Sequence, residues 1–288
     1  MHKLFHYLLI AIIAIAAALA VNHYEAKTVA SDGKESTYER VLRTGEIRCA
    51  YAPFEPDLIK DANTGELSGI FYDVLSEIGR RLNLKINWVE EVGYGVIPEG
   101  FVTGRYDAFC STIWPTAERS RAASFSIPLF YSSVDIFVRN DDHRFDSDIS
   151  KLNDPSIHFA GRDGDVSSAY AKAAFPLAAI DPITQLLDTS QILDDVVHNK
   201  ADAAINSPEL LYDYLKKNPG TLRDITVGHP LRVSANTIMI GPDQYQFKVM
   251  LDTTLQELFY DGTIEKILKK YDKYNTYLRI TKPYAAPQ

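Results

Sequence analysis

Arg119 is the residue of this chain that is best suited to bind a charged solute. It follows a short apolar run, residues 107–110, which has no helical period and therefore predicts a buried strand. In parallel α/β sheets, ligands bind where strands end and helices begin. The planar guanidinium group matches the two oxygens of a carboxylate, so this position predicts a carboxylate clamp. A surface ion pair is the alternative, because Glu118 is adjacent.

The turn between this strand and Arg119 carries further candidates. Ser111 and Thr112 directly follow the apolar run, and Trp114 stands two residues later. Thr116 is expected to cap a short helical turn that holds Arg119. We predict that Ser111, Thr112 and Trp114 line a ligand site; for Trp114, core packing is the alternative, because most tryptophans are highly buried.

The composition excludes several function classes. The chain has 288 residues, of which 46% are hydrophobic and 24% charged, so it is long enough for a sizeable globular core. The net charge of −8 gives no basic footprint, and we expect no nucleic-acid partner. The seven histidines are scattered without metal-ligand spacing, and neither a GxSxG nor a P-loop pattern occurs. We therefore expect no metal, no cofactor and no catalytic residue.

Residues 1–20 predict a secretory signal peptide. His2 and Lys3 precede an apolar run from about residue 8 to residue 21, and Ala18-Leu19-Ala20 is a small-x-small cleavage site. The run is shorter than the ~20 residues of a typical spanning helix. We predict cleavage after Ala20 and a periplasmic protein; an uncleaved membrane anchor is the alternative. Residues 21–37 are polar and small, and predict a flexible leader.

The first half of the exported chain alternates strands with helices. Strands are predicted at residues 47–51, 85–89 and 107–110, and helices at residues 38–43 and 96–102, the latter ended by Gly104. Asp73 is predicted to cap a further helix whose apolar face holds Val74, Leu75, Ile78 and Leu82. This order predicts a parallel α/β lobe.

The second half follows a similar plan. Strands are predicted at residues 134–138, 157–160, 202–205 and 237–240, and helices at residues 167–174, 192–198, 210–217, 245–259 and 264–271. Residues 141–154 are predicted to form a charged loop. A weak internal similarity between residues 104–108 and 199–203 agrees with two lobes of similar plan.

Cys49 and Cys110 are the two cysteines of the chain. An even number in an exported protein suggests a disulfide; two buried thiols are the alternative. Their strands, the first and third of the predicted lobe, are neighbours in doubly wound sheets, about 4.8 Å apart. That spacing lies within the ~4.4 to 6.8 Å between Cα atoms that a disulfide accepts. We predict that Cys49 and Cys110 are bonded.

Four motifs in order resemble those of the bacterial extracellular solute-binding proteins of family 3, the polar amino-acid receptors of ABC importers. The resemblance spans residues 38 to about 275. The motifs are Gly65-Glu66-Leu67-Ser68-Gly69 with Asp73, Ile97-Pro98 with Gly104-x-Tyr106-Asp107, Thr116-Ala117-Glu118-Arg119 with Phe125-Ser126 and Pro128, and Tyr260-Asp261-Gly262-Thr263 with Ile267.

The resemblance implies a two-lobed α/β periplasmic-binding-protein fold of type II. Each lobe would be a mainly parallel sheet flanked by helices, and two hinge strands would join the lobes around a ligand cleft. We predict lobe 1 at residues 38–135 and 241–278, lobe 2 at residues 136–240, and a tail at residues 279–288. The implied partners are a small-molecule solute and the membrane subunits of an ABC importer, and we expect a monomer.

Family positions in the first lobe give a mixed result. By resemblance, Arg119 is the arginine that grips the α-carboxylate of the ligand. Phe54 lies near an aromatic residue that packs on the ligand, and Tyr94 is within one position of another. Tyr51, close to Phe54, is a further candidate, with packing inside lobe 1 as its alternative. Trp114 departs from the family, which usually has serine or threonine there.

Family positions in the second lobe match less well. Asp165 and Val166 stand where the family offers hydroxyl groups, and Asp165 has helix capping as its alternative role. Ser207 stands where an acidic residue usually takes the α-ammonium group, and Asn206 beside it is a candidate ligand contact. The usual ammonium acceptor is therefore missing, which puts an ordinary α-amino acid ligand in doubt.

The sequence thus predicts a receptor that binds a small carboxylate-bearing solute, amino-acid-like or another organic acid, and delivers it to an ABC importer. An exported enzyme on the same fold, such as a cyclohexadienyl dehydratase, is the alternative. It would need a general acid near Arg119, and Asp165, Glu55 and Asp57 are the acids available. An assembly or sensor protein with the receptor fold is a third hypothesis.

Overall fold

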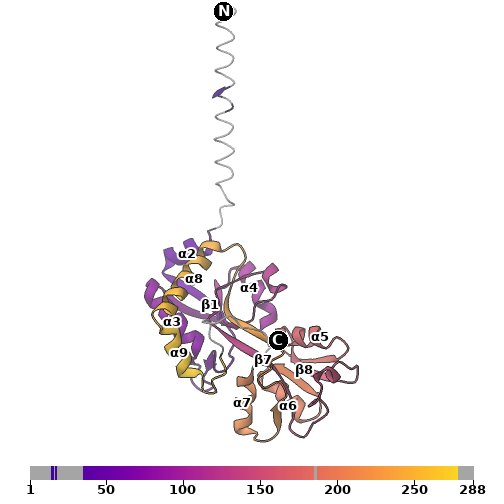
Figure 1. The fold of residues 1–288 in the computed structure, drawn as a ribbon. Helices are drawn as coiled ribbons and strands as arrows, with labels where there is room; N and C mark the ends of the chain where they lie inside the picture. Colours follow the sequence, from indigo (N-terminus) through magenta and orange to yellow (C-terminus); the bar gives the residue numbers. More distant parts are fainter. Residues whose placement is uncertain (1–13, 16, 18–34, 185–186, 278–288) are drawn as a thin grey trace, which may run out of the picture.

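The computed structural model of the chain describes residues 14–15, 17, 35–184 and 187–277. The predicted signal peptide, leader and tail therefore lie mostly or entirely outside the described residues. Within the described ranges, no helix is long and apolar enough to cross a membrane. The described chain forms two α/β lobes (Figure 1).

Lobe 1 is built around three parallel strands. In it, β1 (Glu46–Tyr51) lies between β4 (Lys85–Glu91) and β5 (Ala108–Ile113). The other elements of this lobe are the short strands β2 (Ile59–Lys60), β3 (Leu67–Ser68) and β6 (Ser124–Phe125), the 3₁₀ turns η1 (Tyr94–Val96) and η2 (Arg119–Arg121), and the helices α2 (Thr37–Thr44), α3 (Ile70–Leu82), α4 (Ile97–Thr103), α8 (Tyr245–Tyr260) and α9 (Thr263–Tyr271).

Two clusters of buried side chains lie on opposite faces of this sheet. Cys49 and Cys110 belong to the larger cluster, together with apolar residues of α3, α8 and α9. Ala50 and Phe109 belong to the smaller cluster, together with Ile97 of α4. Successive side chains of a strand point to opposite faces. Consequently α3, α8 and α9 cover one face and α4 covers the other (Figure 1).

The predicted disulfide is confirmed. Cys49 and Cys110 are bonded, with 5.4 Å between their Cα atoms. Cys49 pairs with Ala108 in the register of β1 and β5, so the two strands are neighbours as expected. The bond links these strands shortly before the turns that carry Phe54 and Trp114.

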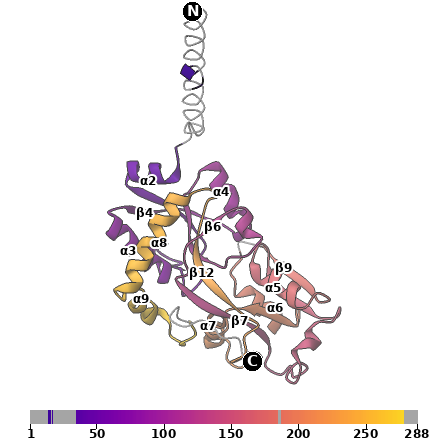
Figure 2. The ribbon, with the colours of Figure 1, turned by 45° about the horizontal axis from the view of Figure 1, so that its top comes forward.

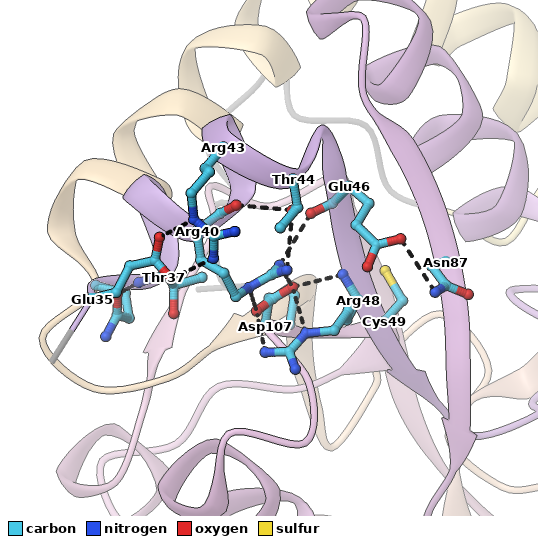
Figure 3. A network of polar contacts seen from close by, with 12 residues as sticks. Glu35, Thr37, Arg40, Arg43, Thr44, Glu46, Arg48, Cys49, Asn87 and Asp107 are labelled. Atoms are coloured by element: carbon cyan, nitrogen blue, oxygen red, sulfur yellow. Dashed lines mark hydrogen bonds and ion pairs between the residues drawn. The ribbon is translucent and has the colours of Figure 1, made fainter.

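A buried carboxylate fastens the first helix to the same two strands. Asp107, whose side chain is buried, accepts hydrogen bonds from Arg40 Nε at 3.1 Å, Arg48 Nη2 at 3.0 Å and the Arg48 backbone N–H at 2.7 Å. Figure 3 shows Arg40 of α2 and Arg48 of β1 converging on Asp107, which immediately precedes β5. Because Asp107 has two cationic partners, its burial is compensated, and the group anchors α2 to the sheet.

Lobe 2 is also organised by parallel strands. In it, β8 (His158–Arg162) lies between β10 (Ala203–Asn206) and β9 (Ala179–Ile183), parallel to both. The other elements are the antiparallel strand β11 (Leu222–Asp224), the 3₁₀ turn η3 (Ile149–Leu152) and the helices α5 (Val166–Ala174), α6 (Gln191–Val197) and α7 (Pro208–Lys217).

Two long strands join the lobes, as predicted. Residues 130–134 of β7 (Phe130–Arg139) pair antiparallel with residues 232–236 of β12 (Arg232–Ile240). Beyond this crossing, β7 pairs with β10 and β11 of lobe 2, whereas β12 pairs with β5 and β6 of lobe 1. One continuous sheet therefore runs through both lobes (Figure 2). Residues 237–240 pair inside lobe 1, although the predicted boundary assigned them to lobe 2.

Several local predictions differ from the structure. Asp73 does not cap its helix, because α3 begins at Ile70 after Gly69; the Asp73 carboxylate instead accepts hydrogen bonds from Lys270 and Tyr271 of α9. The predicted charged loop contains η3. The sequence did not indicate β9 or β11. β9 is an edge strand that contains a proline, and β11 is short and polar, so neither has an apolar alternating pattern.

Candidate ligand-binding site

A pocket lies between the lobes, where β7 and β12 cross. The cavity volume is about 30 Å³, so the pocket is narrow. Lobe 1 and the crossing strands contribute Phe54, Asp57, Tyr94, Thr112, Ile113, Trp114, Arg119, Ser132 and Asn236, and lobe 2 contributes Asp165, Val166, Asn206 and Ser207.

Most of the site residues predicted from the sequence line this pocket, but two do not. Ser111 is fully buried and donates a hydrogen bond to the carbonyl oxygen of Ala52 at 2.6 Å. The ring of Tyr51 packs edge-on against Trp88, with 5.8 Å between ring centroids. Thr112 lines the pocket, whereas the hydroxyl of Ser111 is turned to the chain after β1 by its bond to Ala52. Tyr51 therefore follows its alternative interpretation, packing within lobe 1.

Asn236 of β12 organises the polar side of the pocket, and sequence reasoning missed it. Its Oδ1 accepts hydrogen bonds from Thr112 Oγ1 at 2.5 Å and from Trp114 Nε1 at 3.0 Å. Its Nδ2 donates to Ser132 Oγ at 2.8 Å. This buried amide thereby fixes the predicted residues Thr112 and Trp114 against both crossing strands. The sequence signal that could have indicated Asn236 is its position directly before the apolar strand predicted at residues 237–240.

Trp114 also connects the lobes. Its ring stacks on Tyr170 of α5, with 5.9 Å between centroids and 8° between ring planes, and it belongs to a buried cluster of lobe 2. Trp114 therefore combines both of its predicted roles, since it lines the pocket and packs into a core.

Arg119 lies at the mouth of the pocket and bridges the two lobes. The hydroxyl of Thr116 accepts a hydrogen bond from the Arg119 backbone N–H at 3.1 Å, as expected for the predicted capped turn. The guanidinium Nη1 donates to the carbonyl oxygen of Trp114 and Nη2 to that of Gly164, each at 3.0 Å. These contacts, rather than a pair with Glu118, hold the side chain in place.

Asp57 adds a buried carboxyl group that has no cationic partner in the described part of the chain. It is 3% exposed and accepts a hydrogen bond from Tyr277 Oη at 2.9 Å. Burial, reinforced by the charge of Glu209, raises the pKa of Asp57 to about 7. Glu209 lies in the first turn of α7, is 3% exposed, and has its own pKa raised by burial. Asp57 of lobe 1 and Glu209 of lobe 2 are thus two buried acids that lie close enough for their charges to interact.

Asp165 and Asn206 line the pocket from lobe 2. Asp165 caps α5, since its Oδ1 accepts a hydrogen bond from the Ser167 backbone N–H at 2.9 Å. The Oδ1 of Asn206 accepts one from the Ser207 backbone N–H at 2.8 Å. Among the acids considered for an enzyme, Asp57 and Asp165 therefore line the pocket, whereas Glu55 does not.

Tyr94 forms the wall nearest to lobe 2. Burial raises the pKa of its hydroxyl to about 12, so the ring is neutral at physiological pH. The guanidinium carbon of Arg162 lies 5.0 Å from its ring centroid. Arg162 was not among the predicted site residues, because the sequence does not show that the last residue of β8 faces Tyr94. Among the described residues, no group of three or more histidine, cysteine, aspartate or glutamate side chains is placed to hold a metal ion.

Comparisons with known proteins agree on one family. The model of the bacterial extracellular solute-binding proteins, family 3, matches residues 47–274. In Bacillus subtilis (strain 168), the "Probable amino-acid-binding protein YxeM" is 25% identical over 276 residues, covering 90% of this chain and 93% of that protein. The "Probable ABC transporter extracellular-binding protein YckB" is 25% identical over 246 residues, covering 84% and 83%.

A solved structure shows the same fold. The crystal structure of the ancestral amino acid-binding protein AncCDT-1, a precursor of cyclohexadienyl dehydratase, matches with a TM-score of 0.72 at 23% identity. The match covers 83% of this chain and 100% of that protein. At this identity the likeness concerns the fold and not the ligand.

Proposed function

The chain belongs to the bacterial extracellular solute-binding proteins of family 3, and we propose that it is a periplasmic receptor that closes its two lobes on a small carboxylate-bearing solute. One observation carries the proposal: Arg119 lies at the mouth of the interlobe pocket and donates to backbone carbonyls of both lobes. The guanidinium has further N–H donors, so a carboxylate can accept stronger, charge-assisted hydrogen bonds while the bond to Gly164 of lobe 2 stays in place. Arg119 would thus couple solute binding to lobe closure.

Delivery to an ABC importer is the second part of the proposal. It is supported by the family and by the printed name of the relative YckB, an ABC transporter extracellular-binding protein. The pocket supports capture of a small solute rather than a macromolecule, because it is narrow and lined by residues of both lobes. The amino-acid-binding name of YxeM supports an amino-acid-like or related organic acid.

Substitution of Arg119 tests the proposal. The solute released from the purified protein would be identified by mass spectrometry and titrated by calorimetry. Arg119→Ala should weaken binding by roughly 1.5 to 3 kcal/mol, the typical value of a charged hydrogen bond. Arg119→Lys should also bind poorly, because a point charge does not reproduce the planar fork.

Arg80→Ala is a matched control, since Arg80 is exposed on α3 and pairs with Glu77 outside the pocket. It should bind the solute like the unmodified protein. Unchanged affinity in both Arg119 variants would remove Arg119 from the site.

A further inference from the structure

We propose that Arg162, on lobe 2, binds an acidic group of the solute, so that the receptor selects small organic diacids. Arg119 would hold one acidic group and Arg162 the second. This inference rests on the proposed receptor function and adds the chemical class of the solute.

The first observation is a buried guanidinium fork without a partner. Arg162 is the last residue of β8 and is 5% exposed. Its buried Nε and Nη2 atoms make no hydrogen bond in the structure. Buried donors without a partner are costly, and an arginine is especially so because it stays charged. Nε–H and Nη2–H form one edge of the guanidinium plane, the edge that can bind both oxygens of a carboxylate.

The neighbouring acid does not fill this fork. Asp165 Oδ2 lies 3.5 Å from Arg162 Nη2, an ion pair at a distance that is long for a hydrogen bond. The other oxygen of Asp165 is used to cap α5. Asp165 therefore helps to orient Arg162 and leaves Nε, which is buried, without a hydrogen-bond partner.

The second observation is the position of Arg162 at the edge of the interlobe pocket. Its guanidinium lies over the ring of Tyr94, and both Tyr94 and Asp165 line the pocket. Gly164, two residues further along the chain, accepts the hydrogen bond of Arg119 from lobe 1. Arg119 thus lines the pocket from lobe 1, and Arg162 of lobe 2 lies directly behind two of the residues that line it.

The charged groups around the pocket leave a net positive charge, which favours an acidic solute. Asp165 contributes one negative charge, whereas Arg119 and Arg162 together contribute two positive charges. Burial raises the pKa of Asp57 to about 7, so at or below neutral pH this acid carries half of its charge or less. Because Arg162 has a complete fork of its own, the simplest arrangement gives each arginine a separate acidic group.

Matched diacids and monoamides test this inference in calorimetry. The probes are glutarate beside glutaramate, succinate beside succinamate, and L-glutamate beside L-glutamine. The full secreted protein is first freed of bound solute by unfolding and refolding. For at least one pair, we expect the diacid to bind at least tenfold more tightly than its monoamide.

Variants of Arg162 then assign the preference to one side chain. Arg162→Gln should reduce the preference to threefold or less, because it should lower the affinity for the diacid and leave the affinity for the monoamide unchanged. Arg162→Lys should retain an intermediate preference, because it keeps the charge but loses the fork. The exposed control Arg80→Gln should keep the full preference.

A purely structural role for Arg162 gives a different result. If Arg162 only braced lobe 2 through Tyr94 and Asp165, then Arg162→Gln should unfold at a lower temperature without solute. Such a role would leave the diacid preference unchanged; we expect the preference to fall whatever the change in unfolding temperature.

The outcomes separate this inference from the receptor function. If no diacid binds more tightly than its monoamide, or if Arg162→Gln keeps the preference, the role of Arg162 is overturned while receptor function stands. Recovery of a tightly bound solute with a single acidic group from the purified protein overturns it as well. If the protein yields no bound solute and binds no probe, the receptor proposal itself fails.

Discussion

Asp57 is a residue whose protonation should affect the whole protein. Its carboxyl group is buried in lobe 1, and the charge of Glu209 in lobe 2 acts on it. The hydroxyl of Tyr277 offsets only part of this effect. Folding therefore favours the protonated form of Asp57.

We predict that the free energy of unfolding falls as the pH rises from 5 to 8. The pKa of Asp57 is about 7 in the folded protein and ordinarily 3.8, so between these values the folded state binds more protons than the unfolded state. Each pKa unit corresponds to about 1.4 kcal/mol, which sets an upper bound of roughly 4 kcal/mol for this group. Urea unfolding at pH 5 and pH 8 measures the difference.

Asp57→Asn should remove part of this pH dependence, because the amide does not ionise. Part of the pH dependence should remain in this variant, because burial and the charge of Asp224 raise the pKa of Asp135 to about 7 as well. Glu66→Gln, at an exposed position, is the control and should keep the slope. A wild-type protein that becomes more stable toward pH 8 would contradict this account.

At the scale of elements, the disulfide between β1 and β5 braces the strands that lead to the pocket. The bond joins residues 61 positions apart in the sequence. A cross-link of this length restricts the unfolded chain much more than the folded one. The turns that carry Phe54 and Trp114 start from these two strands.

We predict that the double variant Cys49→Ala/Cys110→Ala loses about 2 to 4 kcal/mol of folding free energy, the usual range for a disulfide. Urea unfolding with and without reductant measures the loss, and the reduced wild type should resemble the variant. Thiol titration of the denatured, unreduced protein should find no free thiol. Two free thiols would show that the bond does not form.

At the scale of the whole molecule, the two lobes meet at a close backbone contact. Gly164 of lobe 2 has a φ of +74°, and a Cβ atom built there would lie 2.6 Å from the backbone nitrogen of Gly95 in lobe 1. The carbonyl oxygen of Gly164 also accepts the hydrogen bond from Arg119. A side chain at this position would therefore keep the lobes apart.

We predict that Gly164→Ala weakens solute binding by at least tenfold and leaves the solute-loaded protein less compact in small-angle scattering. The matched control is Gly220→Ala, because Gly220 has a φ of +75° and a Cβ atom added there would meet no other atom within 4 Å. Both variants introduce similar local backbone strain. Equal affinity in the two variants would show that this contact does not limit closure.

The sequence by itself determined most of the helices and the longer strands, in order, but not β9 or β11. Helix and strand periods, helix-ending glycines and the positions after apolar runs are local properties of the chain. They singled out Arg119 and Thr112, which lie at the pocket, and they correctly paired Cys49 with Cys110. The cysteines could be paired because neighbouring parallel strands have a regular spacing.

Only the tertiary structure decided which side chains of distant segments meet. A strand pattern did not show that Ser111 and Tyr51 face away from the pocket, because this depends on which face of the strand the pocket occupies. Asn236 became the polar centre because β12 crosses between the lobes. Arg162 and Glu209 acquired their roles through burial in the folded chain. Burial and electrostatic interactions arise between segments far apart in the sequence, so local patterns do not contain them.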